Sequence, residues 1–400
     1  MDWNDNPEQA AFRSEVRTLL AEKLPERYRT PGGNWAEDRR SPDPDVSRAA
    51  EEWTEALAER KWFAPHWPEE YGGAGLTIWA QTILREEMAT AHAPAVGGPG
   101  VVQYGPTIIL VGNEEQKRDF LPRMVSGELL MHSGLSEPGA GSDLASLQTR
   151  AVRDGDEYVI NGQKIWTSNG HLADYLWVPV RTDPDAPKHR GISALLIPTD
   201  LPGVEFRPLI NMGGEHGFNE SFFEDVHVPV KNRIGEENRG WYVGATALDF
   251  ERSGIAGSAT VRRDVRELAD YLGSDEGRTR SRLASSPALR REIADVAIAA
   301  DVHYNLCLRI ASMQDAGRVP NYEASMGKVF GTELTQRIAR TAVSAFGLYS
   351  NLWDEDDARA PMDARAARSY VFSVPQTIAG GTSEIQRNII ATRGLGLPRT

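Results

Sequence analysis

The sequence predicts an α+β protein that is mainly α-helical. We expect an N-terminal helical domain, a central antiparallel β domain and a C-terminal four-helix bundle. Two patterns predict this class: apolar residues recur at helical spacing near both ends of the chain, and they alternate with a period of two in the middle. A length of 400 residues is enough for several packed parts. The changes of pattern place the domains at 1–128, 129–239 and 240–400.

The N-terminal domain opens with a helix, because Asn6 is a good cap residue and Pro7 suits the first helical turn. Its apolar side chains share one helix face: Phe12, Val16, Leu19 and Leu20. Residues 61–76 combine Pro, Gly and aromatics, which predicts a structured loop. Helical spacing places further helices at 46–60, 78–91, 100–111 and 113–125. Asn113 and Gln116 have the spacing of a capping box.

The central domain shows the period-two texture of antiparallel strands. Residues 158–166 alternate around Asn161-Gly162, which predicts a hairpin turn because a type I′ turn needs two positive φ angles. Further strands are expected at 192–197, 204–209 and 219–230.

The C-terminal part returns to helical spacing. Helices are expected at 241–272, 287–316, 322–346 and from Thr382 to about Arg393. Glycines close the second and third of them. Four helices with short connections predict a bundle that buries apolar seams along its length.

Composition excludes several classes of protein. A net charge of −13 disfavours nucleic acid as a partner. No apolar run approaches the roughly 20 residues that a membrane-spanning helix needs. The N-terminal residues are acidic and polar, unlike a signal or transit peptide, and Cys307 is the single cysteine. These features predict a cytoplasmic protein without membrane insertion, and the absence of paired His or Cys at ligand spacing predicts no metal site.

The strongest functional signal lies in residues 132–168. Residues 136–143, SEPGAGSD, form a loop of Gly, Ser and Pro that can turn N–H groups and hydroxyls toward a ligand. The segment 161–170, NGQKIWTSNG, follows. The two segments, in this order and at this spacing, resemble the flavin-binding region of the acyl-CoA dehydrogenase family. The order of helical, β and helical parts extends the resemblance over nearly the whole chain.

The resemblance implies FAD-dependent removal of the α proton and the β hydride of an acyl-CoA thioester, with an electron-accepting flavoprotein as a partner. It implies that Trp166 flanks the flavin ring and that Thr167 and Ser168 hydrogen-bond its pyrimidine edge. The other implied FAD contacts are Leu135, Ser136, Ser142, Thr382 and Glu384. The implied substrate contacts are Ser142, Asp249, Arg252 and Gly380.

The catalytic base is one point of departure from the family. Many members carry a glutamate just before the Gly-Thr of the C-terminal motif, where this chain has Gly380. A second placement in the family is a glutamate immediately before an arginine on the first bundle helix. Glu251-Arg252 matches it here. The resemblance therefore implies Glu251 as the base, in keeping with the preference of a desolvated carboxylate for this role.

The segments that reach a neighbouring subunit's FAD in the family also differ here. Residues 274–281 lack the family's Phe-Gly, and residues 344–349 have Ser for Gln and Leu for the second Gly. Arg278 or Arg280 could meet a pyrophosphate. A homodimer or homotetramer that binds FAD in the ordinary way and an α2β2 hetero-oligomer both fit these departures.

Three alternatives stay open at the level of sequence. One is a catalytically silent or FAD-sharing subunit, and the others are a flavin oxidase or monooxygenase on the same fold. Ala379 and Gly380 remove volume near the expected thioester, which suits a branched or bulky acyl group but also fits a straight chain.

Overall fold

The computed structural model describes residues 4–30, 32–249 and 254–398, of which 246–249 are described by their backbone alone. The chain divides into two compact units. The sheet unit comprises residues 14–77 and 91–251, and the bundle unit comprises 1–13, 78–90 and 252–400. The boundary between them falls within the first helix.

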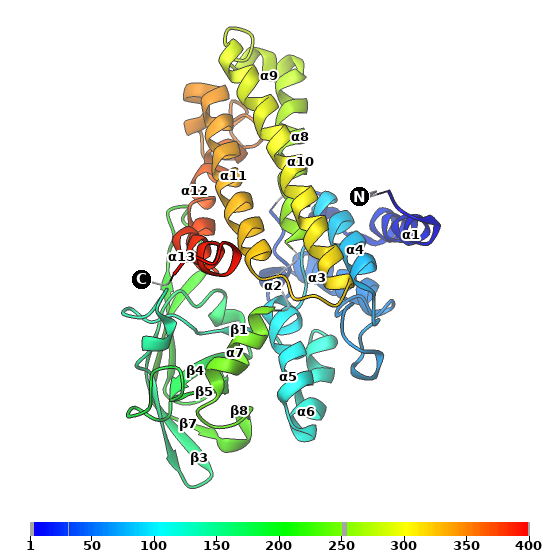
Figure 1. The fold of residues 1–400 in the computed structure, drawn as a ribbon. Coiled ribbons are helices and arrows are strands. Elements are labelled where there is room, and N and C mark those ends of the chain that lie inside the picture. The colour runs from blue at the N-terminus through cyan, green and yellow to red at the C-terminus, as the bar shows by residue number, and fades with distance from the viewer. Residues whose placement is uncertain (1–3, 31, 250–253, 399–400) are drawn as a thin grey trace. The chain divides into compact units, whose positions relative to one another are not determined.

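An eight-stranded sheet forms the centre of the sheet unit (Figure 1). Along the sheet the strand order is β6-β7-β3-β2-β4-β5-β8, and β1 pairs with β4. Most neighbouring strands are antiparallel, but β1 and β2 each pair with β4 in parallel. The sheet is therefore mixed, whereas the sequence predicted an antiparallel one. The strands are β1 Met131–Ser133, β2 Arg150–Asp154, β3 Glu157–Lys164, β4 Tyr175–Arg181, β5 Ile192–Pro198, β6 Val204–Leu209, β7 Phe218–Pro229 and β8 Arg233–Ile234.

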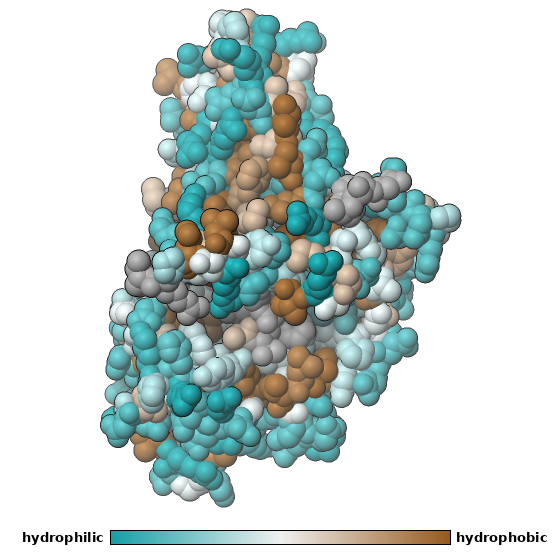
Figure 2. Space-filling view, in the orientation of Figure 1, coloured by the Kyte–Doolittle hydropathy of each residue, from teal (hydrophilic) through white to brown (hydrophobic). Residues whose placement is uncertain are grey.

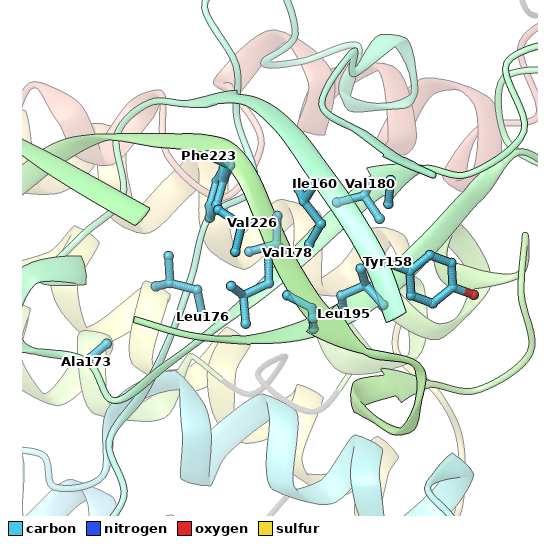
Figure 3. Packing of buried hydrophobic residues seen from close by; sticks show 12 residues of the cluster. Tyr158, Ile160, Ala173, Leu176, Val178, Val180, Leu195, Phe223 and Val226 are labelled. Carbon is cyan, nitrogen blue, oxygen red and sulfur yellow. The ribbon is translucent and has the colours of Figure 1, made fainter. Parts of the chain in front are cut away.

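The core of the sheet comes from side chains that alternate inward along neighbouring strands. Figure 3 shows Tyr158 and Ile160 of β3, Val178 of β4, Leu195 of β5 and Val226 of β7 packed together. All five are fully buried. At roughly 1.5–3 kcal/mol for each large apolar side chain removed from water, this layer provides much of the driving force that keeps the strands in register.

The predicted hairpin turn lies elsewhere in the structure. Strand β3 runs straight through Asn161-Gly162, where its pairing with β7 shifts by one residue as a bulge. The turn falls instead at Gly155, which has φ +58 and connects β2 to β3. The prediction of a turn at Asn161-Gly162 is therefore wrong. The bulge carries its extra residue on β7, opposite the Asn-Gly pair, where Asp225 has φ +47.

Apart from the short helix at 35–38, which was not predicted, the helices of the sheet unit lie close to their predicted positions. They are α2 Trp35–Asp38, α3 Pro44–Ala58, α5 Gly105–Val111, α6 Glu114–Val125 and α7 Gly240–Asp249, and α1 Pro7–Lys23 crosses the boundary between the units. A π-helical turn over Gly100–Tyr104 precedes α5. The loop at 61–76 is structured as predicted, because Trp67 is buried and its Nε1 donates to the Val101 carbonyl at 2.9 Å.

Long helices form the bundle unit, where α8, α10 and α11 pack against one another (Figure 1). Its helices are α4 Ile78–Thr90, α8 Ile255–Gly273, α9 Asp275–Arg280, α10 Pro287–Asp315, α11 Tyr322–Phe346, α12 Arg365–Phe372 and α13 Ser383–Ile389. Side chains cap several N-termini; Ser286, for example, accepts from the Leu289 N–H. Figure 2 shows brown, apolar surface on the bundle, and α10 exposes Ile298 and Val302. None of the described helices combines the length and the apolar character that crossing a bilayer requires.

The predicted single helix over 241–272 is interrupted. Helix α7 ends at Asp249, and α8 begins at Ile255 after Gly254. Gly254 has φ +63, a left-handed conformation that a continuing right-handed helix excludes. The apolar periodicity on both sides gives no sign of this break, because periodicity reports the faces of helices and not their continuity.

The capping box that starts α6 is present as predicted. The Asn113 side chain accepts from the Gln116 N–H at 2.9 Å, and the Gln116 side chain accepts from the Asn113 N–H at 3.0 Å. We expect Asn113→Ala to lower the free energy of unfolding by about 1 kcal/mol, measured by urea denaturation. Asn6 and Gln9 form the same reciprocal pair at an exposed site before α1. Asn6→Ala is the matched control and should cost less. Unchanged stability of both variants would contradict the capping argument.

Candidate functional site

The loop after β1 is folded tightly on itself and tied to the end of β3. The backbones of Glu137 and Ala140 exchange two hydrogen bonds of 2.9 and 3.0 Å, which leaves Pro138 and Gly139 at the exposed tip. The carbonyl of Ser136 accepts from the Ile165 N–H at 2.9 Å. These bonds bring the two halves of the predicted flavin region together in the sheet unit.

A buried ion pair that we did not predict supports this loop. Lys164 and Glu137 are 0% and 6% exposed in their side chains, and Nζ lies 2.8 Å from Oε1. The Glu137 carboxylate also accepts from the Gln148 and Thr149 N–H groups, and Lys164 donates to the Leu135 carbonyl at 3.2 Å. Burial opposes ionisation of Glu137, but Lys164 and these N–H groups outweigh it and lower the carboxyl pKa. Burial lowers the pKa of the Lys164 ammonium against the pull of Glu137.

The turn after β3 presents an aromatic side chain to solvent. Trp166 is 60% exposed, although it packs its edge against Phe218 at a centroid distance of 6.2 Å. Its φ is +59, and Asn169 three residues later has φ +51. Bulky residues rarely adopt this left-handed conformation, and such outliers gather at functional sites. The geometry therefore favours Trp166 as a wall for a flat ligand.

Thr167 and Ser168 face different surroundings. Thr167 is fully buried and its Oγ1 accepts from the Ser221 hydroxyl at 2.8 Å, whereas Ser168 is exposed. The Ser221 hydroxyl therefore fixes the orientation of the Thr167 side chain, and the predicted cofactor contacts of Thr167 and Ser168 stay predictions.

The remaining predicted contacts in the sheet unit are accessible. Leu135 and Ser136 are half-buried, and Ser142 is exposed at the loop surface. Within the described parts of the chain, the hydroxyls of Ser136, Ser142 and Ser168 make no hydrogen bond. An exposed indole beside hydroxyls that have no protein partner is a donor set that fits a flat heteroaromatic ring with polar edges, such as a flavin.

His132 is a further buried group of this region that sequence reasoning missed. It is 5% exposed on β1, and its Nε2 has no hydrogen-bond partner among the residues that the structure describes. Burial, with a smaller contribution from His171, lowers the pKa of its imidazole to about 4. His132 is therefore neutral at physiological pH.

This burial predicts a pH dependence of stability. The unfolded chain binds a proton at His132 near pH 6.5, whereas the folded chain binds it only near pH 4. As the pH falls through this window the unfolded state takes up the proton first, so the free energy of unfolding should fall by about 3 kcal/mol from this group. Denaturation of His132→Gln at pH 7 and pH 4.5 should show a loss smaller than that of the wild type. An equal loss in both proteins would refute the assignment.

The predicted C-terminal residues lie in the bundle unit. Gly380 and Gly381 have φ +64 and +90, and side chains hold both of their carbonyls. Lys328 donates to the Gly381 oxygen at 2.7 Å, and Gln386 donates to the Gly380 oxygen at 3.0 Å. The fold thus fixes the glycine turn from two sides.

Thr382 and Glu384 follow this turn at the start of α13. Thr382 caps the helix by accepting from the Ile385 N–H at 3.2 Å. Glu384 is exposed, and its own N–H and the Thr382 hydroxyl lower its pKa. The Glu384 carboxylate and the capping hydroxyl of Thr382 therefore both lie at the N-terminus of α13, where the helix dipole favours negative charge.

Three predicted residues are not placed as side chains. Glu251 and Arg252 lie outside the described residues, and Asp249 ends α7 with only its backbone described. In the segments predicted to reach a neighbouring subunit, Arg280 pairs with Glu276 at 2.7 Å and Leu348 is 87% exposed. No cluster of potential metal ligands occurs within 4–30, 32–249 and 254–398.

Comparison with known proteins covers the whole chain. Models of three acyl-CoA dehydrogenase domains match it: the N-terminal domain over residues 6–128, the middle domain over 133–226 and the C-terminal domain over 238–395. The acyl-CoA dehydrogenase FadE26 of Mycobacterium tuberculosis is 38% identical over 400 residues, which cover 98% of each chain.

Solved structures agree with this match. The Tcur3481-Tcur3483 steroid ACAD has a TM-score of 0.87 at 33% identity, and covers 100% of both chains. The ChsE4-ChsE5 complex from Mycobacterium tuberculosis has a TM-score of 0.82 at 38% identity, also with 100% of both chains covered.

Proposed function

Because this chain belongs to the acyl-CoA dehydrogenase family, we propose that it dehydrogenates the Cα–Cβ bond of an acyl-CoA thioester and releases trans-2-enoyl-CoA. FAD, when bound, accepts the hydride that leaves Cβ. The observation that carries the proposal is the exposed Trp166 beside hydroxyls without protein partners, at the end of a strand held by a buried ion pair. The buried ion pair holds the strand in place, and the indole stays exposed to a ligand.

The residues of this chain divide the work. Trp166 flanks the flavin ring, Thr167 and Ser168 hydrogen-bond its pyrimidine edge, and Leu135 and Ser136 lie along the ring and the ribityl chain. The buried Thr167 side chain also anchors the turn, and Ser142 contacts both the cofactor and the thioester in this proposal. Thr382 and Glu384 contribute cofactor contacts from the start of α13.

Proton transfer falls to Glu251, which takes the α proton, with Asp249 and Arg252 beside it as substrate contacts. A positioned carboxylate in a dry site has a pKa raised toward the working range, which suits proton abstraction. Gly380 has no side chain for this task, so the glycine turn serves to admit substrate.

A bulky acyl group is the substrate class that we propose. A Cβ added at Gly380 would meet no described heavy atom within 4 Å, so the turn adds little bulk of its own. A structural relative at 33% identity bears the name steroid ACAD. Both observations favour a polycyclic or branched acyl group over a straight chain.

Assembly with a second, different chain is the oligomeric state that we propose. The departures at 274–281 and 344–349 fit this assembly as well as a homodimer or homotetramer, and two structural relatives with paired subunit names support it. We also propose the boundaries 1–128, 129–239 and 240–400 for the domains, and an electron-accepting flavoprotein as the oxidant of the reduced enzyme. FAD per chain, measured with and without a co-expressed partner chain, tests the assembly.

Anaerobic titration with a panel of acyl-CoAs tests the reaction itself. Purified protein should lose its visible flavin absorbance with a polycyclic or branched acyl-CoA and much less with a straight-chain one. Bound FAD that no acyl-CoA bleaches would contradict the dehydrogenation. Fast reoxidation of the reduced flavin by O₂ would favour an oxidase or monooxygenase on this fold. Failure to bind FAD or acyl-CoA in any assembly would favour a silent subunit.

A further inference from the structure

The turn from Trp166 to Asn169 has an unfavourable backbone conformation and is hydrogen-bonded by residues in and just before β7. Trp166 and Asn169 both have positive φ. Such conformations persist only where the surrounding structure over-determines them. The Asn169 N–H donates to the Gly217 carbonyl at 3.0 Å, and most of the other bonds come from Asn219 of β7, which is fully buried.

Asn219 binds Thr167 at three points. The Thr167 N–H donates to the Asn219 carbonyl at 3.0 Å, and the Thr167 carbonyl accepts from the Asn219 backbone N–H at 3.2 Å. The side-chain Nδ2 of Asn219 donates to the same Thr167 carbonyl at 3.0 Å. Ser221, two residues further along β7, holds the Thr167 hydroxyl. Thr167 therefore cannot move without breaking several buried hydrogen bonds.

Two histidines complete the hydrogen bonds of the Asn219 amide. His216 Nε2 lies 2.8 Å from Asn219 Oδ1, and His171 Nδ1 lies 3.0 Å from Asn219 Nδ2. The two imidazole rings stack at a centroid distance of 3.9 Å and an angle of 15°. This cluster, Asn219, His171 and His216, lies entirely within the sheet unit.

The Thr167 carbonyl fixes the chemistry of the whole cluster. A carbonyl can only accept, so the amide end that faces it must be the NH₂ group. The other end is then the oxygen, and His216 must carry a proton on Nε2 to donate to it. His171 must leave Nδ1 unprotonated to accept from the amide. Every polar atom of the Asn219 side chain is satisfied in one arrangement only.

We propose that Asn219, His216 and His171 are positioning residues that hold Trp166 and Ser168 in the geometry needed to bind the flavin. This role rests on the proposed function, because we propose that the cluster acts on the flavin through the turn. A hydrogen-bond network with a single satisfied arrangement around the buried Asn219 amide keeps the turn rigid. Rigidity of the groups around a ligand raises affinity by lowering the ordering cost of binding.

Asn219→Asp tests the role with almost no change in volume. The carboxylate keeps an acceptor for His216 but cannot donate to the Thr167 carbonyl or to His171. We expect the dissociation constant for FAD to rise about tenfold, as expected from the loss of about one net hydrogen bond. The absorption bands and the midpoint potential of the bound flavin should shift as well.

His216→Phe is a second variant in case the buried carboxylate prevents folding. It keeps an aromatic ring to stack on His171 and removes the donor to Asn219, so it should shift the flavin bands in the same direction by less. Asn161→Ala is the matched control. It removes another side chain that crosses between β3 and β7, where Asn161 bonds Asp225, and should leave the flavin properties unchanged.

The outcomes separate the positioning role from the proposed function. Variants that melt at lower temperature but bind FAD with wild-type affinity, spectrum and potential would overturn the positioning role alone. A wild-type chain that binds no FAD, alone or with a partner chain, would overturn the proposed function and this role with it.

Discussion

Replacing Glu251 with Gln is expected to leave FAD bound while slowing the bleaching of the flavin by substrate about 10²- to 10⁴-fold, the usual contribution of a positioned general base. Gln has nearly the shape of Glu but cannot take the α proton. Because proton removal and hydride departure form one double bond, loss of the base should also stop reduction of the flavin. Anaerobic stopped-flow absorbance with the best acyl-CoA of the panel measures the rate.

Glu236→Gln is the matched control for this experiment. Glu236 is an exposed acid of the same chain with no role in the proposed site, so its variant should reduce the flavin at the wild-type rate. Near-native reduction by the Glu251→Gln protein would remove Glu251 as the base and would mean that another group takes the α proton.

Replacing Lys164 with Met should lower the free energy of unfolding by about 3–5 kcal/mol. The substitution keeps most of the side-chain volume but leaves the buried Glu137 carboxylate without its cation. An uncompensated buried charge costs this much because water cannot replace the lost partner. Urea denaturation at pH 7 measures the loss, and the double variant Lys164→Met with Glu137→Gln should recover part of it.

Lys188 provides the comparison for Lys164. It also pairs with an acid of the loop after β1. Its Nζ lies 2.8 Å from Asp143 Oδ2, but the two side chains are 50% and 60% exposed. Lys188→Met should therefore cost less than about 1 kcal/mol. Equal losses for the two lysine variants would mean that burial does not govern the strength of these pairs.

Much of the fold could be predicted, because helical and period-two spacing report which faces of an element are buried. The capping box at Asn113 and the strands β5, β6 and β7 follow their predicted bounds closely. The hairpin failed because two similar signals compete in one stretch. Gly155-Asp156 makes the turn, whereas Asn161-Gly162 stays in strand β3, opposite a bulge of β7. In the observed arrangement Tyr158 and Ile160 both pack in the core of the sheet. That packing depends on residues far away in the sequence, which no short motif contains.

In the candidate site, too, local patterns report which side chains point inward but not the contacts between distant parts of the chain. Lys164 is an even-numbered residue like the buried Tyr158 and Ile160, so strict alternation could have predicted that it points inward and needs an anion. The roles of His132, His171 and Asn219 depend on contacts across the sheet, which are invisible to spacing. Neither the parallel pairing of β1 with β4 nor the left-handed Gly254 leaves a local pattern.

The contacts of Glu137 also couple three segments of this region. One carboxylate joins the loop after β1 to the start of β2 through two backbone amides and to the end of β3 through Lys164. We therefore expect the loop and the β2–β3 hairpin to open as one cooperative unit. Hydrogen exchange of the Gln148, Thr149 and Ile165 amides should then report one common free energy of opening.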